Sequence, residues 1–151
     1  MGKFSILILI IFCLSCTDKV QEESPTAIQW GDNLEIAFSF ALNSNKIIMI
    51  DFMAEWCPPC QKMDEETFSN PNIIKKSNDF IPVRIDVDKQ PKIANKYNGN
   101  ARKYGGTGIP NILFLDKEKN TIRHIVGFHD PEKLIAIMDS VLIEFKDLYS
   151  K

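Results

Sequence analysis

The sequence predicts one α/β domain in which helices cover both faces of a mixed central β-sheet. Residues 47–54 (IIMIDFMA) form a short, nearly continuous apolar run, which is typical of a strand buried on both faces. Later apolar runs flank a polar turn and predict a hairpin, and segments with helical spacing separate the strands. The chain of 151 residues is long enough for one domain with its own core and too short for two.

The first half of the domain contains a helix, the buried strand and a second helix. Apolar residues follow helical spacing over residues 33–43, and Asp32 stands where a helix cap is expected. After the strand, the CPPC sequence at 57–60 leads into a further helix that continues to Glu66. Prolines are tolerated there because the amides of a first helical turn have no internal partner.

The second half continues with a strand, a helix and a loop. Residues 80–87 (FIPVRIDV) predict the strand. A helix is expected over residues 91–104, although an Asn-Gly-Asn sequence weakens it. The glycine-rich residues 105–108 are expected to form a loop.

A hairpin and a last helix complete the predicted domain. Residues 111–115 and 122–126 flank the polar turn at 116–120 and predict the two strands of the hairpin. Asp130 and Pro131 provide a cap and a first-turn proline for the helix, whose apolar residues extend to Phe145.

Composition and charge exclude several function classes. Hydrophobic residues make up 44% and charged residues 25% of the chain, which are ordinary values for a globular protein. A net charge of −2 gives no sign of the basic surface that nucleic-acid binding requires. Four cysteines are too few for a domain held together mainly by disulfides.

Residues 1–16 are expected to be an export signal. Lys3 precedes an apolar run at 4–14, which is shorter than the roughly 20 residues of a membrane-spanning helix but suits a secretory signal. The LSC sequence that follows resembles a bacterial lipoprotein signal, in which Cys16 would become a lipidated N-terminus. Cys13 departs from this pattern, since a leucine is common at its position. A signal peptide cut slightly later, or an uncleaved anchor, is the alternative.

Export would place the protein in the cell envelope or periplasm, attached to a membrane through lipid at Cys16. Disulfides can persist in such a compartment. Residues 17–27 (TDKVQEESPTA) are polar and lack periodicity, so we expect a tether there, with an ordered arm as the alternative. The folded domain is then expected over residues 28–151.

The CPPC pair has three possible roles: a metal site, a structural bridge or redox exchange. The second pair with this spacing, at 13–16, lies in the expected signal. Structural zinc needs four ligands, and His124 and His129 are poorly placed to converge, so both are expected to be surface or half-buried packing residues. A bridge between residues three apart restrains the unfolded chain little.

Redox exchange fits the pair best. A strand that leads into a helix places Cys57 at the helix N-terminus, where unpaired amides and the helix dipole favour a thiolate. Cys60 lies one turn further along the same face and is expected to be deeper. We therefore expect Cys57 to attack a partner disulfide and Cys60 to resolve the resulting mixed disulfide.

The segment FMAEWCPPC at 52–60 resembles the active-site segment of thioredoxin-fold proteins. Asp51 matches the family's buried acid, and Gly127 matches a glycine late in its last strand. Ile109 and Pro110 match the cis-proline that helps to hold the substrate backbone; a trans turn proline is the alternative. The resemblance implies a thioredoxin fold, a redox-active disulfide in the CPPC pair, and no metal or organic cofactor.

The resemblance also implies roles for three other side chains. A buried Asp51 would have a raised pKa and would accept the proton of Cys60 through water; an acid exposed at the strand edge is the alternative. Trp56 is expected to lie at the substrate-binding surface, mainly as a packing and shielding residue. Arg84 takes the place of a family lysine near the buried acid, and we expect a solvated strand charge rather than a group that tunes that acid.

Residues 66–71 (ETFSNP) and 126–128 (VGF) resemble the C-terminal thioredoxin-like domain of the bacterial transmembrane thiol–disulfide interchange reductase. This resemblance implies a monomeric reductase of protein disulfides that receives electrons from a membrane thiol–disulfide reductase. Pro58 replaces the glycine of ordinary thioredoxins, which leaves the reduction potential open. The segment from Arg84 to Pro110 is longer than in thioredoxin and predicts a different partner-facing loop. A disulfide-forming oxidant of the same fold and a non-catalytic binding or chaperone module are the alternatives.

Overall fold

The structure, a computed structural model, describes residues 25–97 and 108–149. The expected export signal with Cys16, most of the expected tether and most of the glycine-rich loop lie outside the described residues, as does the last part of the helix expected over 91–104. In the described parts of the chain, no helix is both long and apolar enough to cross a membrane.

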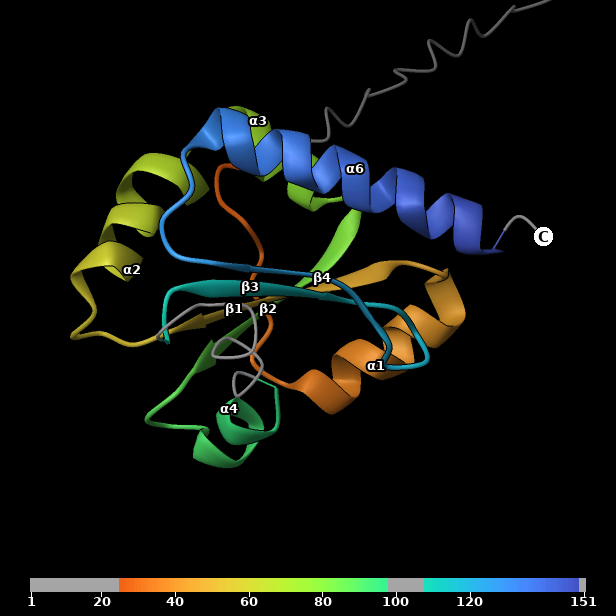
Figure 1. Ribbon diagram of the computed structural model, residues 1–151, viewed down its shortest axis with the longest axis horizontal. Helices are drawn as coiled ribbons and strands as arrows, with labels where there is room; N and C mark the ends of the chain where they lie inside the picture. The colour runs from red at the N-terminus through yellow and green to blue at the C-terminus, as the bar shows by residue number, and fades with distance from the viewer. Residues whose placement is uncertain (1–24, 98–107, 150–151) are drawn as a thin grey trace, which may run out of the picture.

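A four-stranded mixed sheet lies at the centre of the domain, with strand order β2-β1-β3-β4 (Figure 1). Its strands are β1 (Ile47–Met53), β2 (Phe80–Asp86), β3 (Asn111–Leu115) and β4 (Thr121–Val126). β1 pairs in parallel with β2 and antiparallel with β3, and β3 pairs antiparallel with β4. The predicted mixed sheet and its hairpin are therefore confirmed.

Helices cover both faces of the sheet (Figure 1). One face carries α1 (Leu34–Ser44) and α4 (Pro91–Tyr97), and the other carries α3 (Pro71–Ser77) and α6 (Pro131–Tyr149). Between β1 and α3, the short helix α2 (Pro58–Lys62) runs directly into a π-helix, η1 (Met63–Phe68), which packs against α3 and α6.

The central strand β1 is buried on both faces, as its apolar sequence predicts. Successive side chains of a strand point to opposite faces of the sheet. Ile48 and Ile50 accordingly pack in the core beneath α1, whereas Met49 packs in the core with η1, α3 and α6. Asp51 follows Met49 by two residues, so its carboxyl group lies on the face that η1 covers.

Three local predictions are wrong in detail. The cap of α1 is Asn33 rather than Asp32, because the Asn33 side chain accepts hydrogen bonds from the amides of Glu35 and Ile36. Leu42, one of the apolar residues whose spacing over residues 33–43 predicts this helix, is exposed. The separate helix α3 was not predicted, although Asn70 and a proline at the next position form its cap and first turn.

Candidate active site

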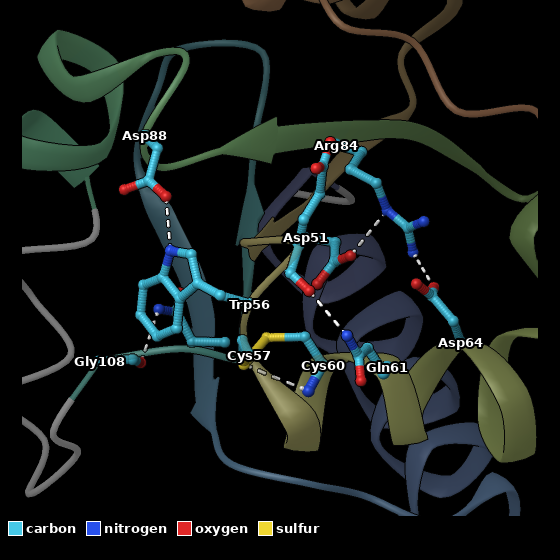
Figure 2. The surroundings of a disulfide bond; sticks show 11 residues. Asp51, Trp56, Cys57, Cys60, Gln61, Asp64, Arg84, Asp88 and Gly108 are labelled. Carbon is cyan, nitrogen blue, oxygen red and sulfur yellow. Dashed lines mark hydrogen bonds and ion pairs between the residues drawn. A yellow bond between two sulfur atoms is a disulfide. The ribbon is translucent and has the colours of Figure 1, made fainter.

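The cysteine pair lies at the N-terminal end of α2, shortly after the end of β1. Cys57 is the N-cap of α2, with prolines in the first turn, and Cys60 lies one turn into the helix. The two form a disulfide with a Cα–Cα distance of 5.2 Å (Figure 2). The amide of Cys60 donates to Cys57 Sγ at 3.2 Å, so a donor already faces the sulfur that would carry the thiolate charge.

Both sulfurs are well covered in this disulfide form. Cys57 is 2% exposed and Cys60 is 3% exposed, so the expected greater depth of Cys60 is not seen. The two cysteines and Ala54 form a buried cluster, and three partly buried apolar residues pack against this cluster as a rim: Met53, Val87 and Ile109. A sulfur that exchanges with the pair must therefore approach past this rim.

Asp51 is buried, as predicted, with 1% of its surface exposed. Burial raises the pKa of its carboxyl group to about 6, against the opposing influence of Arg84. Asp51 Oδ2 accepts a hydrogen bond from Arg84 Nε at 2.9 Å, whereas Oδ1 has no hydrogen-bond partner among the described residues. A carboxyl group in this state can exchange a proton near neutral pH.

Arg84 corrects the expectation of a solvated strand charge. It lies beside Asp51 in the parallel register of β1 and β2. Its Nε binds Asp51, and its Nη2 donates to Asp64 Oδ1 at 2.5 Å (Figure 2). The guanidinium also stacks on Trp30 at 4.5 Å from the ring centre. Arg84 is therefore a bridge between two carboxylates.

Sequence reasoning missed Asp64 entirely. The residue lies on η1, four positions after Cys60, and only the path of that π-helix brings it to Arg84. Its negative charge raises the pKa of Asp51, after the larger influences of burial and of Arg84. The acidic run that follows the CPPC motif was the available signal, since one of its members lies one helical turn beyond the second cysteine.

Trp56 lies beside the disulfide and is 65% exposed, so it shields little of the core. Its indole Nε1 donates to Asp88 Oδ2 at 2.5 Å (Figure 2). Next to it, Lys89 Nζ lies 2.6 Å from Glu55 Oε1. These two contacts connect the loop before the cysteines to the turn after β2. Trp56 thus presents an apolar ring at the surface next to the cysteine pair (Figure 2).

The loop that leads into β3 also lies close to the cysteine pair, since Ile109 packs against the buried cluster that contains it. The Ile109–Pro110 peptide bond is cis, as the resemblance implies. The Gly127 amide donates to the Pro110 carbonyl at 2.8 Å, which ties the end of β4 to this loop. Gly127 has φ +89°, a conformation that glycine adopts without steric cost. The structure therefore brings Ile109, Pro110 and both cysteines together.

The two histidines occupy different environments. His124 on β4 is half-buried, and its Nε2 lies 3.0 Å from Asn111 Oδ1. His129 is buried, and its Nδ1 lies 2.9 Å from the Gly127 carbonyl. Within residues 25–97 and 108–149, no three His, Cys, Asp or Glu side chains form a group that could hold a metal ion.

Comparison with known proteins gives a consistent result. A thioredoxin-like domain family matches residues 34–142. Thioredoxin-2 of Pyricularia oryzae is 35% identical over 108 residues, which cover 68% of this chain and 53% of that protein. The thiol:disulfide interchange protein DsbD of Haemophilus influenzae is 26% identical over 110 residues, which cover 72% of this chain but 18% of DsbD.

Solved structures show the same fold. A thioredoxin from Thermus thermophilus superposes with a TM-score of 0.61 at 20% identity, covering 79% of this chain and 90% of that one. The oxidised C-terminal domain of DsbD from Neisseria meningitidis gives 0.56 at 23% identity, covering 74% and 97%. The chain therefore belongs to the thioredoxin-like domain family, resembles the C-terminal domain of DsbD, and is a thiol–disulfide oxidoreductase-like protein with a CxxC disulfide at Cys57 and Cys60.

Proposed function

We propose that this protein is an exported reductase that passes electrons from its Cys57–Cys60 dithiol to disulfides in other proteins, here called clients. The observation that carries the proposal is a cysteine pair at a helix start beside Asp51, whose pKa is raised to about 6. A helix start favours the thiolate, and a base of this pKa is suited to moving a proton at pH 7. The resemblance of residues 66–71 to a membrane reductase supports the reductive direction.

The first step is attack by the Cys57 thiolate on one sulfur of the client disulfide. A bond forms between Cys57 Sγ and that sulfur, and the other client sulfur leaves as a thiolate. Cys60 then gives its proton to Asp51 through water, and its sulfur attacks Cys57 Sγ. The Cys57–Cys60 disulfide forms and the second client sulfur leaves as a thiolate, which takes the proton held by Asp51, while the first client thiolate takes a proton from solvent. Two electrons have passed to the client.

The rim of the disulfide would dock the client. Trp56 offers an exposed ring, and Ile109, which precedes Pro110, packs against the buried cluster that contains both cysteines. An extended client segment placed between them would bring its disulfide to Cys57. This docking is part of the proposal, and its support is the position of Ile109 against the cysteine pair.

Electrons would return to the cysteine pair from a membrane thiol–disulfide reductase. A lipid at Cys16 and a tether over residues 17–27 would keep the domain in the envelope, close to that donor. The support for this arrangement is the apolar run that ends at LSC. We expect Cys16→Ser to move the protein from the membrane fraction to the soluble fraction while its reductase activity in solution is kept.

Trapping of intermediates tests the mechanism. The variant Cys60→Ser should accumulate mixed disulfides with clients, because nothing resolves the bond to Cys57. The variant Cys57→Ser serves as the matched control and should trap none. Disulfide reduction by Cys57→Ser at the wild-type rate would contradict the mechanism. Full biological function of a variant that lacks both cysteines would instead indicate a binding or chaperone module.

A further inference from the structure

The side chain of Asn111 connects the loop beside the disulfide to the edge strand. Asn111 is fully buried and follows Pro110 directly. Its Nδ2 donates to the Gly108 carbonyl at 3.1 Å, and its Oδ1 lies 3.0 Å from His124 Nε2 on β4. A chain of two hydrogen bonds thus extends from β4 to the start of the loop.

The direction of both bonds follows from the chemistry of the groups. A carbonyl oxygen only accepts, so the Asn111 amide nitrogen must face Gly108 and its oxygen must face His124. The oxygen can only accept as well, and His124 Nε2 therefore carries the hydrogen. Burial lowers the pKa of His124, which favours the neutral ring.

The strand register explains how His124 reaches this position. On β3 and β4, Asn111 lies opposite Val126 and Leu113 lies opposite His124. Side chains at alternate positions share a face, so His124 is the diagonal neighbour of Asn111. The same strand also holds the other end of the loop, through the Gly127 amide and the Pro110 carbonyl at 2.8 Å.

Ile109 lies between these two anchored carbonyls. The Gly108 carbonyl is linked to β4 through the side chains of Asn111 and His124. The Pro110 carbonyl accepts a hydrogen bond directly from the Gly127 amide. Ile109 packs against the buried cluster of Ala54, Cys57 and Cys60, so the position of its backbone determines how a client segment would lie over Cys57. A loop held at one end only would present that backbone in several orientations, and docking would have to select one of them.

We propose that Asn111 and His124 are positioning residues that fix the Gly108–Pro110 loop for client docking. This inference rests on the proposed reductase function. It concerns extended polypeptide clients, which must lie along the loop. Small disulfides should be insensitive, because they reach Cys57 without using the loop.

The test compares variants of His124 that keep or remove the donor. In His124→Gln, the side-chain amide can place an N–H where Nε2 stands, whereas His124→Phe keeps a ring without a donor. Asn111→Leu removes the centre of the chain at similar volume. Arg123→Gln is the matched control on the same strand, since Arg123 pairs with Glu144 and takes no part in these bonds.

Two substrates separate docking from chemistry. The first is insulin, whose reduction by the protein is followed with dithiothreitol as the final electron donor. The second is 5,5′-dithiobis(2-nitrobenzoate), whose reaction with the reduced protein, corrected for the reaction of Cys57→Ser, measures attack by Cys57 without a polypeptide to dock. We expect His124→Phe and Asn111→Leu to raise KM for insulin about tenfold, with kcat and the reaction with the small disulfide within twofold of wild type. His124→Gln should restore KM to within threefold, and Arg123→Gln should leave it unchanged.

An unchanged KM in His124→Phe, or an equal loss with both substrates, would overturn the inference. Asn111 is fully buried; if its variant does not fold, the two His124 variants decide the question alone. Failure of the wild-type protein to reduce insulin at all would contradict the proposed function instead, and the two failures are therefore distinguishable.

Discussion

Two aspartates are buried, Asp51 within β1 and Asp116 directly after β3, and they differ in how many hydrogen bonds their carboxylates accept. Asp116, 3% exposed, lies in the turn after β3. Its Oδ1 accepts from the amides of Glu118 and Asn120, each at 2.8 Å. Its Oδ2 accepts from Asn120 Nδ2 at 2.9 Å and from the Tyr149 hydroxyl at 3.0 Å. Each carboxylate oxygen of Asp116 therefore accepts two hydrogen bonds. Three of the four come from the turn, and one comes from Tyr149.

Asp51 is as deeply buried but has far fewer partners. Arg84 serves one oxygen, and the other has no hydrogen-bond partner in the part of the chain that the structure describes. Burial therefore dominates and raises the pKa of Asp51 to about 6. Burial alone does not distinguish a functional acid from a structural one. The number of hydrogen-bond donors around the carboxylate distinguishes the two, since Asp116 has four and Asp51 has one.

Removal of Asp116 should have the largest effect on stability. The variant Asp116→Ala loses four hydrogen bonds and leaves the amides of Glu118 and Asn120 unpaired in the turn. At about 1 kcal/mol for each bond, the free energy of unfolding should fall by about 4 kcal/mol. Urea unfolding at pH 7 measures this change. A loss below about 1 kcal/mol would mean that Asp116 is no more a structural acid than Asp51.

Asp51 should affect stability in the opposite direction and in a pH-dependent manner. Its pKa in the folded protein is about 6, above the ordinary value of 3.8 for an exposed carboxyl group. Between these values the folded state binds more protons than the unfolded state, so stability is highest below about pH 4 and falls as the pH rises through about 6. The loss should amount to about 3 kcal/mol.

The variant Asp51→Asn should lack this pH dependence and should be more stable than wild type at pH 8. Urea unfolding of the oxidised proteins across pH 4–8, expressed as the difference between variant and wild type, isolates the contribution of Asp51 from other groups. A difference that stays constant over this range would show that Asp51 has an ordinary pKa and would remove the contrast with Asp116.

The two aspartates should also differ in their effect on catalysis. Without Asp51 to accept the proton of Cys60, resolution of the mixed disulfide should slow at least tenfold in Asp51→Asn. Rapid-mixing measurements of mixed-disulfide decay report this step directly. Asp116→Asn is the control and should decay at the wild-type rate when assayed well below its unfolding temperature. Equal slowing in both variants would indicate a general loss of structure.

The smallest expected effects concern the neighbours of Asp51. Arg84→Met removes a positive charge and should raise the pKa of Asp51 further. Asp64→Asn removes a negative charge and should lower that pKa by a smaller amount. Carboxyl carbon NMR of the two variants measures both shifts. Shifts in the same direction would contradict the bridge that Arg84 forms between the two carboxylates.

The sequence was sufficient for features that depend on local pattern. The apolar run of β1 predicted a buried strand, and the position of Asp51 within it predicted a buried acid. The CPPC motif after a strand predicted a cysteine at a helix start, which is where Cys57 lies. In each case the evidence lies within a few residues of the feature.

Features that depend on the meeting of distant segments were missed or misjudged. The sequence around Arg84 predicts a solvated surface charge. The parallel register of β1 and β2 instead places Arg84 beside Asp51. Asp64 reaches Arg84 only because it lies on the π-helix η1, and π-helices are rare and hard to predict from sequence. The link from His124 to Asn111 likewise requires the register of β3 and β4. Each of these contacts is set by tertiary packing.

The central claim is that the Cys57–Cys60 pair gives electrons to protein disulfides. Its most direct test is the reduction potential of this couple, obtained by equilibrating the protein against dithiothreitol or glutathione at pH 7. A value near about −270 mV, as in thioredoxin, is the predicted result and fits a reductase that a membrane partner supplies with electrons. A value near about −120 mV would contradict the claim, since the pair would then be an oxidant that installs disulfides.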